Sequence, residues 1–588
     1  MNNEIKSEKI LVKEIFSEMW FRIPEYQRPY VWDNDQITEF LEDISYAMLE
    51  KSDSEYFLGS FVFQSRKEIS ADGIEFIEND LLDGQQRITT MLLMFSVLRD
   101  RVTDEEAEKS CQECIFQAAN RFKRIPERSR ITFAIRQEAS EFIDELSKNK
   151  DFTDNRDKIR SFEEKAADIS VRNMAKAIRL INQFFDEGKN QIKPETYFDF
   201  LLNNLLMIYV STENFEDAFR LFTILNDRGI PLRNSDILKA INLGALQNNQ
   251  EKKKYATMWE NAESDLGDDF DRFLSHVRTI LVKEKARLSL LQEYEDKIYS
   301  PKEKGKATGI KKPALLKKGR DTFEFIKRHL KNYQQINSEN NYDITGDFKF
   351  DNLIKTMLVG LPATDWLPPL LHYYDKFGGG AIFRFLTLLD NKFSADWIVQ
   401  LTPTVRIESM NDIIKEIDAQ EDYVNVLTSR TLMFDANALF TELNGKIYGR
   451  RFARYVLLKL DYLYQDHSHK MNCETISVEH ILPQKPTEGS QWCTDFTEQQ
   501  RDDLTDILGN LVLISRRKNA SQGRLDYKDK KEKYFKERIN TCPNSLRVLN
   551  QNDKWDSEAL EENHNICLEK LKAHYSQHDK INVPEDVA

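Results

Sequence analysis

The sequence predicts a helix-rich α+β protein of several domains, and three observations carry this prediction. The chain has 588 residues, a length that corresponds to about three or four domains. Apolar residues recur at helical spacing over most of it, whereas segments rich in β-formers gather near residues 56–82, 201–210 and 475–514. Hydrophobic residues make up 40% and charged residues 31%, which is typical of a soluble globular protein.

The first hundred residues predict a helix, two strands and a second helix. Residues 35–44 carry apolar side chains at i, i+3, i+4 and i+7, the stripe of an amphipathic helix. Residues 56–63 and 76–82 are rich in β-formers and are predicted to pair as a hairpin. A polar turn at 83–87 then leads into a long apolar helix over 88–98.

The next part of the chain predicts a helical insertion followed by a return to the first domain. Residues 101–200 are charge-rich and mostly helical in pattern, whereas 201–210 favour a strand. Residues 218–225 predict a helix that stops at an Asn-Asp-Arg-Gly turn, after which Ser235 or Asp236 begins another helix. We therefore place the first domain at 1–245, with an insert at about 100–200.

The rest of the chain divides into a helical middle region, 246–440, and a C-terminal domain, 441–588. The middle region carries no readable motif, and the basic segment 301–320 is either a solvated loop or a DNA contact. In the C-terminal domain, residues 475–478 and 511–514 predict two strands.

Composition limits the cellular context and the class of protein. No apolar run approaches the roughly 20 residues that span a bilayer, and the first residues lack a secretory pattern, so we expect a cytoplasmic protein without a membrane partner. A net charge of −14 argues against a protein that coats nucleic acid, although a local basic surface can still bind it. Six cysteines do not form a disulfide framework.

Two short polar motifs near the N-terminus have the chemistry of an anion site. Gln27, Arg28 and Tyr30 lie in a turn bounded by prolines, where an arginine can form a bidentate pair with phosphate. Tyr30 can stack on a base, but core packing is an equal alternative. Residues 83–87 supply the second motif, which consists of Asp83, Gly84, Gln85, Gln86 and Arg87.

This second motif precedes a helix, whose N-terminus favours an anion. Gly84 permits a tight turn, Gln85, Gln86 and Arg87 supply donors, and Asp83 supplies a carboxylate for a metal or a water molecule. A capped helix start with solvated polar groups is the alternative. The sequence contains no GxxxxGK[ST] phosphate loop.

The C-terminal domain carries a histidine and oxygen donors around two predicted strands. His480 stands at the end of the first strand and can deprotonate a water molecule, and the neighbouring Glu479 is a ligand suited to Mg²⁺. Asn510 begins the second strand, where its amide can hold the backbone around His480, and Asn519 starts a helix. A basic cluster follows at Arg516, Arg517, Lys518 and Arg524, where phosphates of DNA would lie or where a solvated helix face is exposed.

These C-terminal residues resemble the ββα-metal (HNH) nucleases and, more closely, the nuclease half of GmrSD-type modification-dependent (type IV) restriction enzymes. The resemblance covers roughly 440–545. It implies that Glu479 and Asn519 bind Mg²⁺ or another divalent cation, that His480 is the general base, and that Asn510 orients it.

The N-terminal motifs resemble the GmrS-type domain, which is related to the ParB fold and binds and hydrolyses nucleoside triphosphates. This resemblance covers about 10–245. It implies that Gln27, Arg28, Asp83, Gln85, Gln86 and Arg87 bind the nucleotide, with Asp83 acting in hydrolysis. The turn at Asn226 and Arg228 matches a third element of that family.

Together the resemblances imply a nucleotide-regulated, metal-dependent endonuclease that cleaves double-stranded modified DNA of phages. Its partners would be DNA, a nucleoside triphosphate of unknown base and, for double-strand cutting, a second copy of the chain. Two alternatives remain open. One is a nucleotide-responsive DNA-binding or regulatory subunit of a defence system with little cleavage, and the other is an RNA-cleaving toxin.

Overall fold

The computed structural model describes residues 6–576 except 25–26, 51, 53, 71–72, 121, 123–124, 135, 188–191, 213–232, 302–312, 338–340, 472–475, 516–523 and 537–541. The chain divides into two compact units. The first comprises Met1–Gly267 and Lys318–Arg320, and the second comprises Asp268–Lys317 and Asp321–Ala588. In the described residues no helix is long and apolar enough to cross a membrane.

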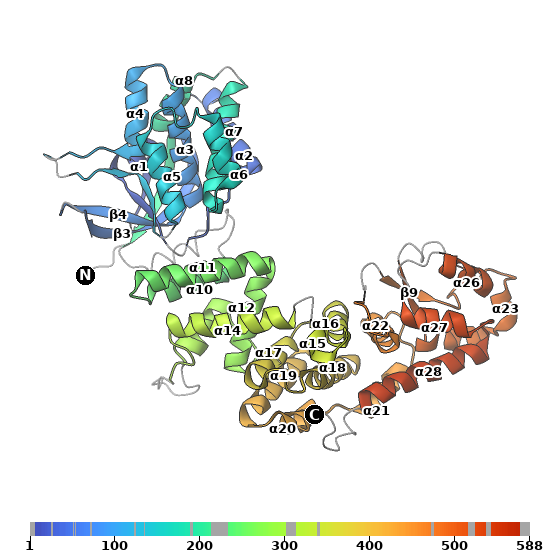
Figure 1. Ribbon diagram of the computed structural model, residues 1–588. Helices are drawn as coiled ribbons and strands as arrows, with labels where there is room; N and C mark the ends of the chain where they lie inside the picture. The colour runs from blue at the N-terminus through green and yellow to red at the C-terminus, as the bar shows by residue number, and fades with distance from the viewer. Residues whose placement is uncertain are drawn as a thin grey trace. The chain divides into compact units, whose positions relative to one another are not determined.

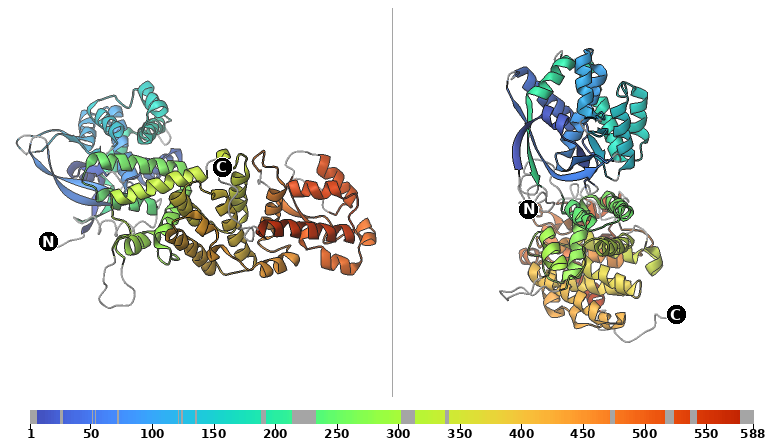
Figure 2. Two further views of the ribbon diagram at one scale, coloured as in Figure 1. Left: turned by 60° about the horizontal axis from the view of Figure 1, so that its bottom comes forward. Right: turned by 90° about the vertical axis from the view of Figure 1, so that its left-hand side faces the viewer.

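The first unit contains a six-stranded mixed sheet in the order β1-β8-β3-β4-β2-β7 (Figure 1 and Figure 2). β3 and β4 form the predicted antiparallel hairpin, while β8 joins β3 in parallel and β1 in antiparallel pairing. The strand bounds are β1 Lys6–Leu11, β2 Phe21–Ile23, β3 Tyr56–Ile69, β4 Glu75–Asp83, β5 Phe116–Gln117, β6 Arg128–Ser129, β7 Ile131–Phe133 and β8 Leu205–Thr212.

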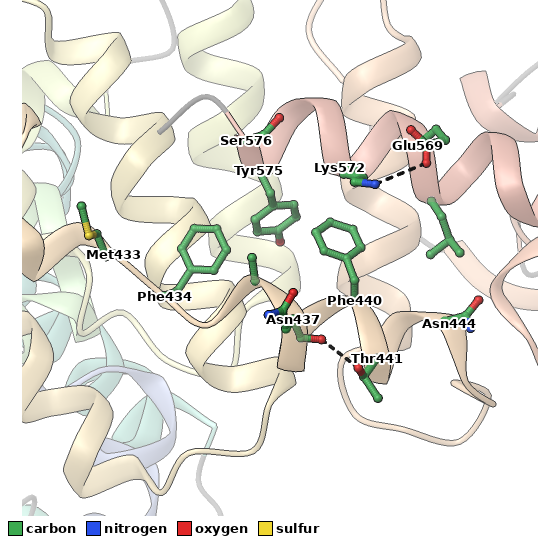
Figure 3. Close-up of a pocket in the computed structure, with 12 residues that line it drawn as sticks. Met433, Phe434, Asn437, Phe440, Thr441, Asn444, Glu569, Lys572, Tyr575 and Ser576 are labelled. Atoms are coloured by element: carbon green, nitrogen blue, oxygen red, sulfur yellow. Dashed lines mark hydrogen bonds and ion pairs between the residues drawn. The ribbon is translucent and has the colours of Figure 1, made fainter. Parts of the chain in front are cut away.

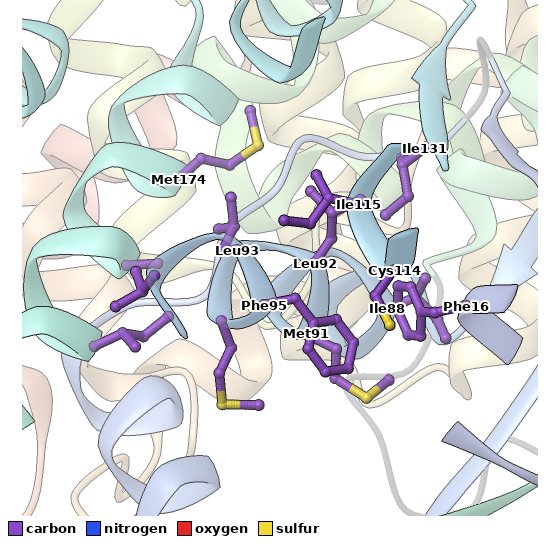
Figure 4. Packing of buried hydrophobic residues seen from close by; sticks show 14 of the residues in the cluster. Phe16, Ile88, Met91, Leu92, Leu93, Phe95, Cys114, Ile115, Ile131 and Met174 are labelled. Carbon is purple, nitrogen blue, oxygen red and sulfur yellow. The ribbon is translucent and has the colours of Figure 1, made fainter. Parts of the chain in front are cut away.

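Helices of this unit pack around α3, whose buried residues form the centre of the core (Figure 4). The predicted helices over 35–44 and 88–98 are confirmed as α2 and α3. The helix bounds are α1 Val12–Glu18, α2 Asn34–Glu50, α3 Gln85–Arg101, α4 Glu105–Ile115, α5 Gln137–Lys148, α6 Arg156–Lys165, α7 Ile169–Asp186, α8 Pro194–Asn203, α10 Asn234–Gly244 and α11 Asn249–Leu266.

Two expectations for this unit change in detail. Residues 101–200 are mostly helical as predicted, but they also supply β7, which pairs with β2 inside the main sheet. The strand expected at 201–210 begins at Leu205, because Pro194 opens helix α8 and Tyr197, Phe198 and Leu201 form its buried face. Both α8 and β8 therefore contribute buried side chains to the core of the unit.

The second unit is helical up to α22 and ends in a smaller part with two strands, which agrees with the predicted helical middle region and C-terminal strands. Its longer helices are α12 Phe270–Val282, α14 Arg320–Ile336, α16 Lys349–Gly360, α17 Leu367–Phe377, α18 Ile382–Ile398, α19 Pro403–Ala419, α21 Ala436–Asn444, α22 Ala453–Tyr464, α26 Tyr527–Lys536, α27 Pro543–Gln551 and α28 Ser557–Tyr575. Shorter elements are η2 Gly267–Asp269, α13 Leu290–Glu293, η3 Tyr294–Tyr299, α15 Tyr342–Thr345, α20 Tyr423–Leu427, η4 Arg430–Leu432, α23 Gln491–Asp495, α24 Glu498–Leu504 and η5 Leu508–Asn510.

The two strands of this unit are β9 Ile476–His480 and β10 Leu511–Ser515, which pair in antiparallel fashion as predicted. β10 packs against α22 and α27, while Lys530 on α26 reaches β9. The pair thus sits between helices that come from before and after it in the sequence. This packing fixes the end of β9, where His480 lies.

Candidate functional site

In the first unit, buried glutamines hold the first polar motif against the second. Gln27 donates its Nε2 hydrogen to the carbonyl of Leu82 at 2.7 Å, just before the turn. Gln85 donates Nε2 to the carbonyl of Arg28 at 3.2 Å. Both side chains are buried, so these bonds bring the two motifs together as the sequence predicted.

Gln86 holds the backbone of the first motif, and its predicted contact with a nucleotide stays a prediction. Its Oε1 accepts from the backbone N–H groups of Val31 at 2.9 Å and Trp32 at 3.2 Å, and its Nε2 donates to the carbonyl of Pro29 at 3.2 Å. The sequence alone did not reveal these bonds, because the bonded residues lie more than fifty positions apart and meet only in the folded chain.

Tyr30 follows the core-packing alternative rather than the stacking one. The side chain is fully buried, and its hydroxyl forms a 2.7 Å hydrogen bond with Thr90 Oγ1 on α3. Burial raises the pKa of this phenol well above its usual range. Tyr30 therefore anchors the turn to the core and does not offer a ring to a ligand.

The turn at Gly84 creates an open helix start. Gly84 adopts a φ of +84°, and a Cβ there would lie 2.6 Å from Phe61 Cβ, so only glycine fits. α3 begins at the next residue with no side-chain cap on its first N–H groups. Gln85 Oε1 and Thr89 Oγ1 are buried there with no hydrogen-bond partner among the described residues, which is expected of a site that completes its bonds with a ligand.

Two arginines and a carboxylate surround this helix start. Arg87 donates Nη1 to the carbonyl of Leu58 at 3.2 Å, across Gly59, where a Cβ would collide with the guanidinium. Burial raises the pKa of Asp83, while Arg87, the Gly84 N–H and Arg28 pull it back down. Burial also lowers the pKa of both arginines. The predicted Arg28, Asp83 and Arg87 thus interact within one half-buried cluster.

Sequence reasoning assigned Asp236 only to a helix start, but it also belongs to this cluster. Its Oδ2 accepts from the backbone N–H of Arg233 at 3.0 Å, in the first turn of α10. Burial raises its pKa, and Lys239 and Arg28 are among the groups that lower it again. Asp236 and Asp83 therefore act on Arg28 from two different elements.

Glu263 on α11 extends this charged cluster and was also missed. Burial raises its pKa to about 7, with Lys239 opposing and Asp236 reinforcing the shift. Its Oε1 accepts from the indole N–H of Trp259 at 3.1 Å. Carboxyls that titrate near neutrality are typical of functional sites. The predicted Asn226 and Arg228 lie outside the described residues.

In the second unit, Asn510 holds the backbone beyond His480, as the sequence predicted. Its Oδ1 accepts from the N–H of Leu482 at 2.8 Å, and its Nδ2 donates to the carbonyls of Leu482 at 2.9 Å and Thr505 at 2.7 Å. The side chain is fully buried, and His480 pairs with Leu511 in the strand register. The Asn510 amide thus joins the segment that follows His480 to the segment that precedes β10.

The imidazole of His480 is oriented by Asp506, a residue that sequence reasoning missed. His480 Nε2 lies 3.0 Å from Asp506 Oδ1, which also accepts from Gln484 Nε2 at 3.0 Å. A carboxylate accepts hydrogen bonds, so Nε2 carries the proton and Nδ1 keeps the lone pair. The Tyr448 ring packs on the imidazole with centroids 4.1 Å apart.

The protonation of His480 follows from its surroundings. Burial lowers its pKa below the usual value, the bond to Asp506 raises it, and Lys530 lowers it further. The net shift is downward, so the imidazole is neutral at neutral pH. A neutral imidazole with a fixed Nε2 proton can accept a proton at Nδ1.

Glu479, the predicted metal ligand, is held by a lysine in this structure. Lys530 Nζ lies 3.1 Å from Glu479 Oε1 and donates to the carbonyl of His480 at 2.7 Å. Burial raises the pKa of Glu479, and Lys530 opposes that shift. Across the described part of the chain no group of three or more His, Cys, Asp or Glu side chains could hold a metal. A carboxylate remains the donor type that a hard cation prefers.

The remaining predicted residues of this domain fall mostly in a gap of the structure. Asn519, the second expected metal ligand, lies outside the described residues, as do Arg516, Arg517 and Lys518. Arg524 is described and exposed, just before α26.

Comparison with known proteins matches both parts of the chain to one family. The model described as "GmrSD restriction endonuclease, N-terminal domain" matches residues 10–243, and that of the C-terminal domain of GmrSD restriction endonucleases matches residues 435–570. The chain belongs to the GmrSD restriction endonucleases. No curated protein matches it.

As a GmrSD restriction endonuclease, the chain acts on DNA, and apart from Glu263 both clusters lie inside the matched regions. The cluster around Arg28, Asp83 and Arg87 falls in the N-terminal match, and the one around His480 falls in the C-terminal match. Residues 244–434, most of the helical middle region, lie between the two.

Proposed function

We propose that this chain is a nucleotide-regulated, metal-dependent endonuclease of the HNH type that cuts modified foreign DNA. The observation that carries this proposal is the His480–Asp506 pair, which leaves a neutral imidazole with a lone pair on Nδ1. An endonuclease that uses water needs such a base.

In the proposed reaction, Nδ1 of His480 accepts a proton from a water molecule. The water oxygen forms a bond to the phosphorus of the DNA backbone, and the bond from phosphorus to the leaving sugar oxygen breaks. A divalent cation held by Glu479 and Asn519 would stabilise the negative charge on that oxygen. Asn510 and Asp506 keep the imidazole in place, and Arg524 and the basic residues 516–518 would contact backbone phosphates.

In the first unit we propose that Arg28 and Arg87 bind the phosphates of a nucleoside triphosphate at the start of α3. Gln85, whose buried Oε1 has no partner among the described residues, would contact the same ligand. Asp83 and Asp236 are carboxylates of the type that hold the accompanying Mg²⁺ or a water molecule. We also propose a ParB-like origin for this domain and action as a homodimer in the cytoplasm.

His480→Ala tests the assignment of the nuclease site. We expect the variant to lose cleavage of DNA while it hydrolyses nucleoside triphosphate at the wild-type rate, because the two clusters lie in separate units. Asp502→Asn, at an exposed carboxylate on α24, is the matched control and should cut normally. Cleavage that survives His480→Ala would show that another residue is the base.

One observation favours the regulatory alternative. Lys530 neutralises Glu479, so a cation must compete with it for the same carboxylate. If the chain is a regulatory subunit, plasmid DNA should stay uncut over a wide range of Mg²⁺ concentrations. If it is a nuclease, Lys530→Gln should lower the Mg²⁺ concentration that half-saturates nicking.

A further inference from the structure

A polar cavity in the helical middle region has no role in the sites described above. It has a volume of about 670 Å³ and lies between α12, the segment 284–290, the segment 361–365 and α19. Cavities of this size are typical of sites for small molecules or parts of larger ligands.

The lining of this cavity contains buried polar groups that the protein leaves unsatisfied. Asn411 on α19 is 2% exposed, and among the described residues neither its Oδ1 nor its Nδ2 has a hydrogen-bond partner. His276 on α12 is 7% exposed; its Nε2 lies 3.2 Å from Thr364 Oγ1, and its Nδ1 has no hydrogen-bond partner in the part of the chain that the structure describes. Unsatisfied buried groups are costly, so two of them on one cavity indicate a ligand.

The charges around the cavity balance one another. Three basic and three acidic side chains line it: Arg272, Arg278, Lys285, Glu284, Glu293 and Asp365. Arg278 forms a buried pair with Glu293, with Nε 3.0 Å from Oε2, and Lys285 donates to Thr404 at 2.7 Å. The cavity therefore has no excess of positive charge for a phosphate.

The groups of the cavity also suit a ligand without charge. Burial and Arg272 lower the pKa of His276 to about 4, so the imidazole is neutral at neutral pH. An asparagine amide offers one donor and one acceptor side by side, the pattern that matches the edge of a nucleobase. Leu361, Pro362 and Met410 add apolar surface for the faces of a ring.

A second cavity of the same unit serves as a comparison. It has a volume of about 750 Å³ and is lined by three aromatic rings, Phe434, Phe440 and Tyr575 (Figure 3). Its polar groups are largely satisfied: the Tyr575 hydroxyl lies 2.7 Å from Ser394 Oγ, and Asn444 Oδ1 lies 3.1 Å from His564 Nε2. It lacks the unsatisfied buried groups that mark the first cavity.

We propose that the Asn411–His276 cavity receives a nucleobase extruded from the DNA. The bases, with any substituent they carry, are the neutral hydrogen-bonding part of DNA, and a buried amide can read only a base that has left the stack. The proposal rests on the proposed function in that it takes DNA as the ligand. It assigns base recognition to the region between the two matched domains.

The test is binding of free deoxynucleosides to the full chain, measured by saturation-transfer NMR at millimolar concentration. The probes are the four ordinary deoxynucleosides and deoxycytidine bearing a hydroxymethyl or glucosylated hydroxymethyl group. We expect transfer to the base protons of at least one probe. Asn411→Leu should weaken that binding at least tenfold, while Glu408→Gln, an exposed position one turn away on α19, should not change it.

Folding of the variant is checked separately. Leucine has nearly the shape of asparagine and removes two unsatisfied polar atoms, so Asn411→Leu should melt at or above the wild-type temperature. The proposal fails if no probe binds the wild type, if Asn411→Leu binds as tightly, or if transfer reaches only the sugar protons of the probes. His480→Ala should bind the probes normally, so cleavage that survives this substitution would contradict the nuclease assignment and not the cavity.

Discussion

Two effects shift the pKa of His480 in opposite directions. Burial in the domain lowers its pKa, and the Asp506 carboxylate raises it while fixing the proton on Nε2. The chemistry at this residue therefore depends on a neighbour that lies 26 positions further along the chain.

Asp506→Asn tests this pair. We expect kcat to fall by about 10²-fold, the lower end of what a general base contributes, because the imidazole loses its charged anchor. In the proposed reaction cleavage needs the neutral imidazole, so activity should be lost as pH falls through the pKa of His480. Removal of a carboxylate that raises this pKa should move the acid limb of the kcat/KM profile to lower pH.

The measurement is the pH profile of plasmid nicking for wild type, Asp506→Asn and the exposed control Asp502→Asn. An acid limb that stays in place, or moves to higher pH, would show that Asp506 does not act on the base. A merely structural role would change stability without moving the limb.

At the scale of elements, the start of α3 depends on backbone geometry at Gly84. Alanine there must adopt a left-handed conformation, which costs about 1–2 kcal/mol, and it must also push Phe61 away. We expect Gly84→Ala to lose nucleotide binding while the second unit keeps its fold. Calorimetric titration with a non-hydrolysable triphosphate measures the effect.

Gly73→Ala is the matched control for this prediction. Gly73 also has a positive φ, of +76°, but an added Cβ meets no atom within 4 Å. The control carries the same kind of strain without the collision and should bind nucleotide normally. Equal loss in both variants would mean that strain alone, and not the shape of the helix start, is responsible.

In the candidate nuclease site, the side chain of Asn510 holds the backbone beside strands β9 and β10. Asn510→Ala leaves buried backbone groups of Leu482 and Thr505 without their partner. We expect a loss of about 3 kcal/mol in the free energy of unfolding of this domain and no cleavage. Thermal denaturation beside the exposed control Gln499→Ala measures the loss, and wild-type melting would contradict the role of the amide.

The sequence predicted elements well where apolar periodicity or β-forming runs were long. The helices predicted over 35–44 and 88–98, the hairpin of β3 and β4 and the pairing of β9 with β10 are confirmed. The strand at 201–210 was displaced because a proline and a buried helical face outweighed β propensity there.

Site residues were predictable only where they belong to a compact motif. His480 and Asn510 were found because each sits at a strand end, but Asp506 was not, since its link to His480 exists only after β9 and β10 pair. Asp236 was likewise missed as a site residue, because α10 brings it to Arg28 from more than two hundred residues away. Glu263 was missed because it joins the cluster only through Asp236 and Lys239. The Asn411–His276 cavity has no local signature at all.

At the scale of the whole molecule, one chain carries two candidate sites of different chemistry. Each compact unit holds one cluster, with arginines and carboxyls in the first and a histidine–aspartate pair in the second. Separate units allow each activity to be removed alone. Any dependence of cutting on nucleotide must then be a coupling between them.

Cleavage and triphosphate hydrolysis in the same reaction test the central claim most directly. Wild type, His480→Ala and Arg87→Gln would be given matched modified and unmodified phage DNA with Mg²⁺, with and without nucleotide. The account predicts that wild type cuts the modified DNA and hydrolyses nucleotide. His480→Ala should only hydrolyse, and cutting by Arg87→Gln should no longer respond to nucleotide. Undiminished cutting by His480→Ala, or an unchanged nucleotide response in Arg87→Gln, would contradict it.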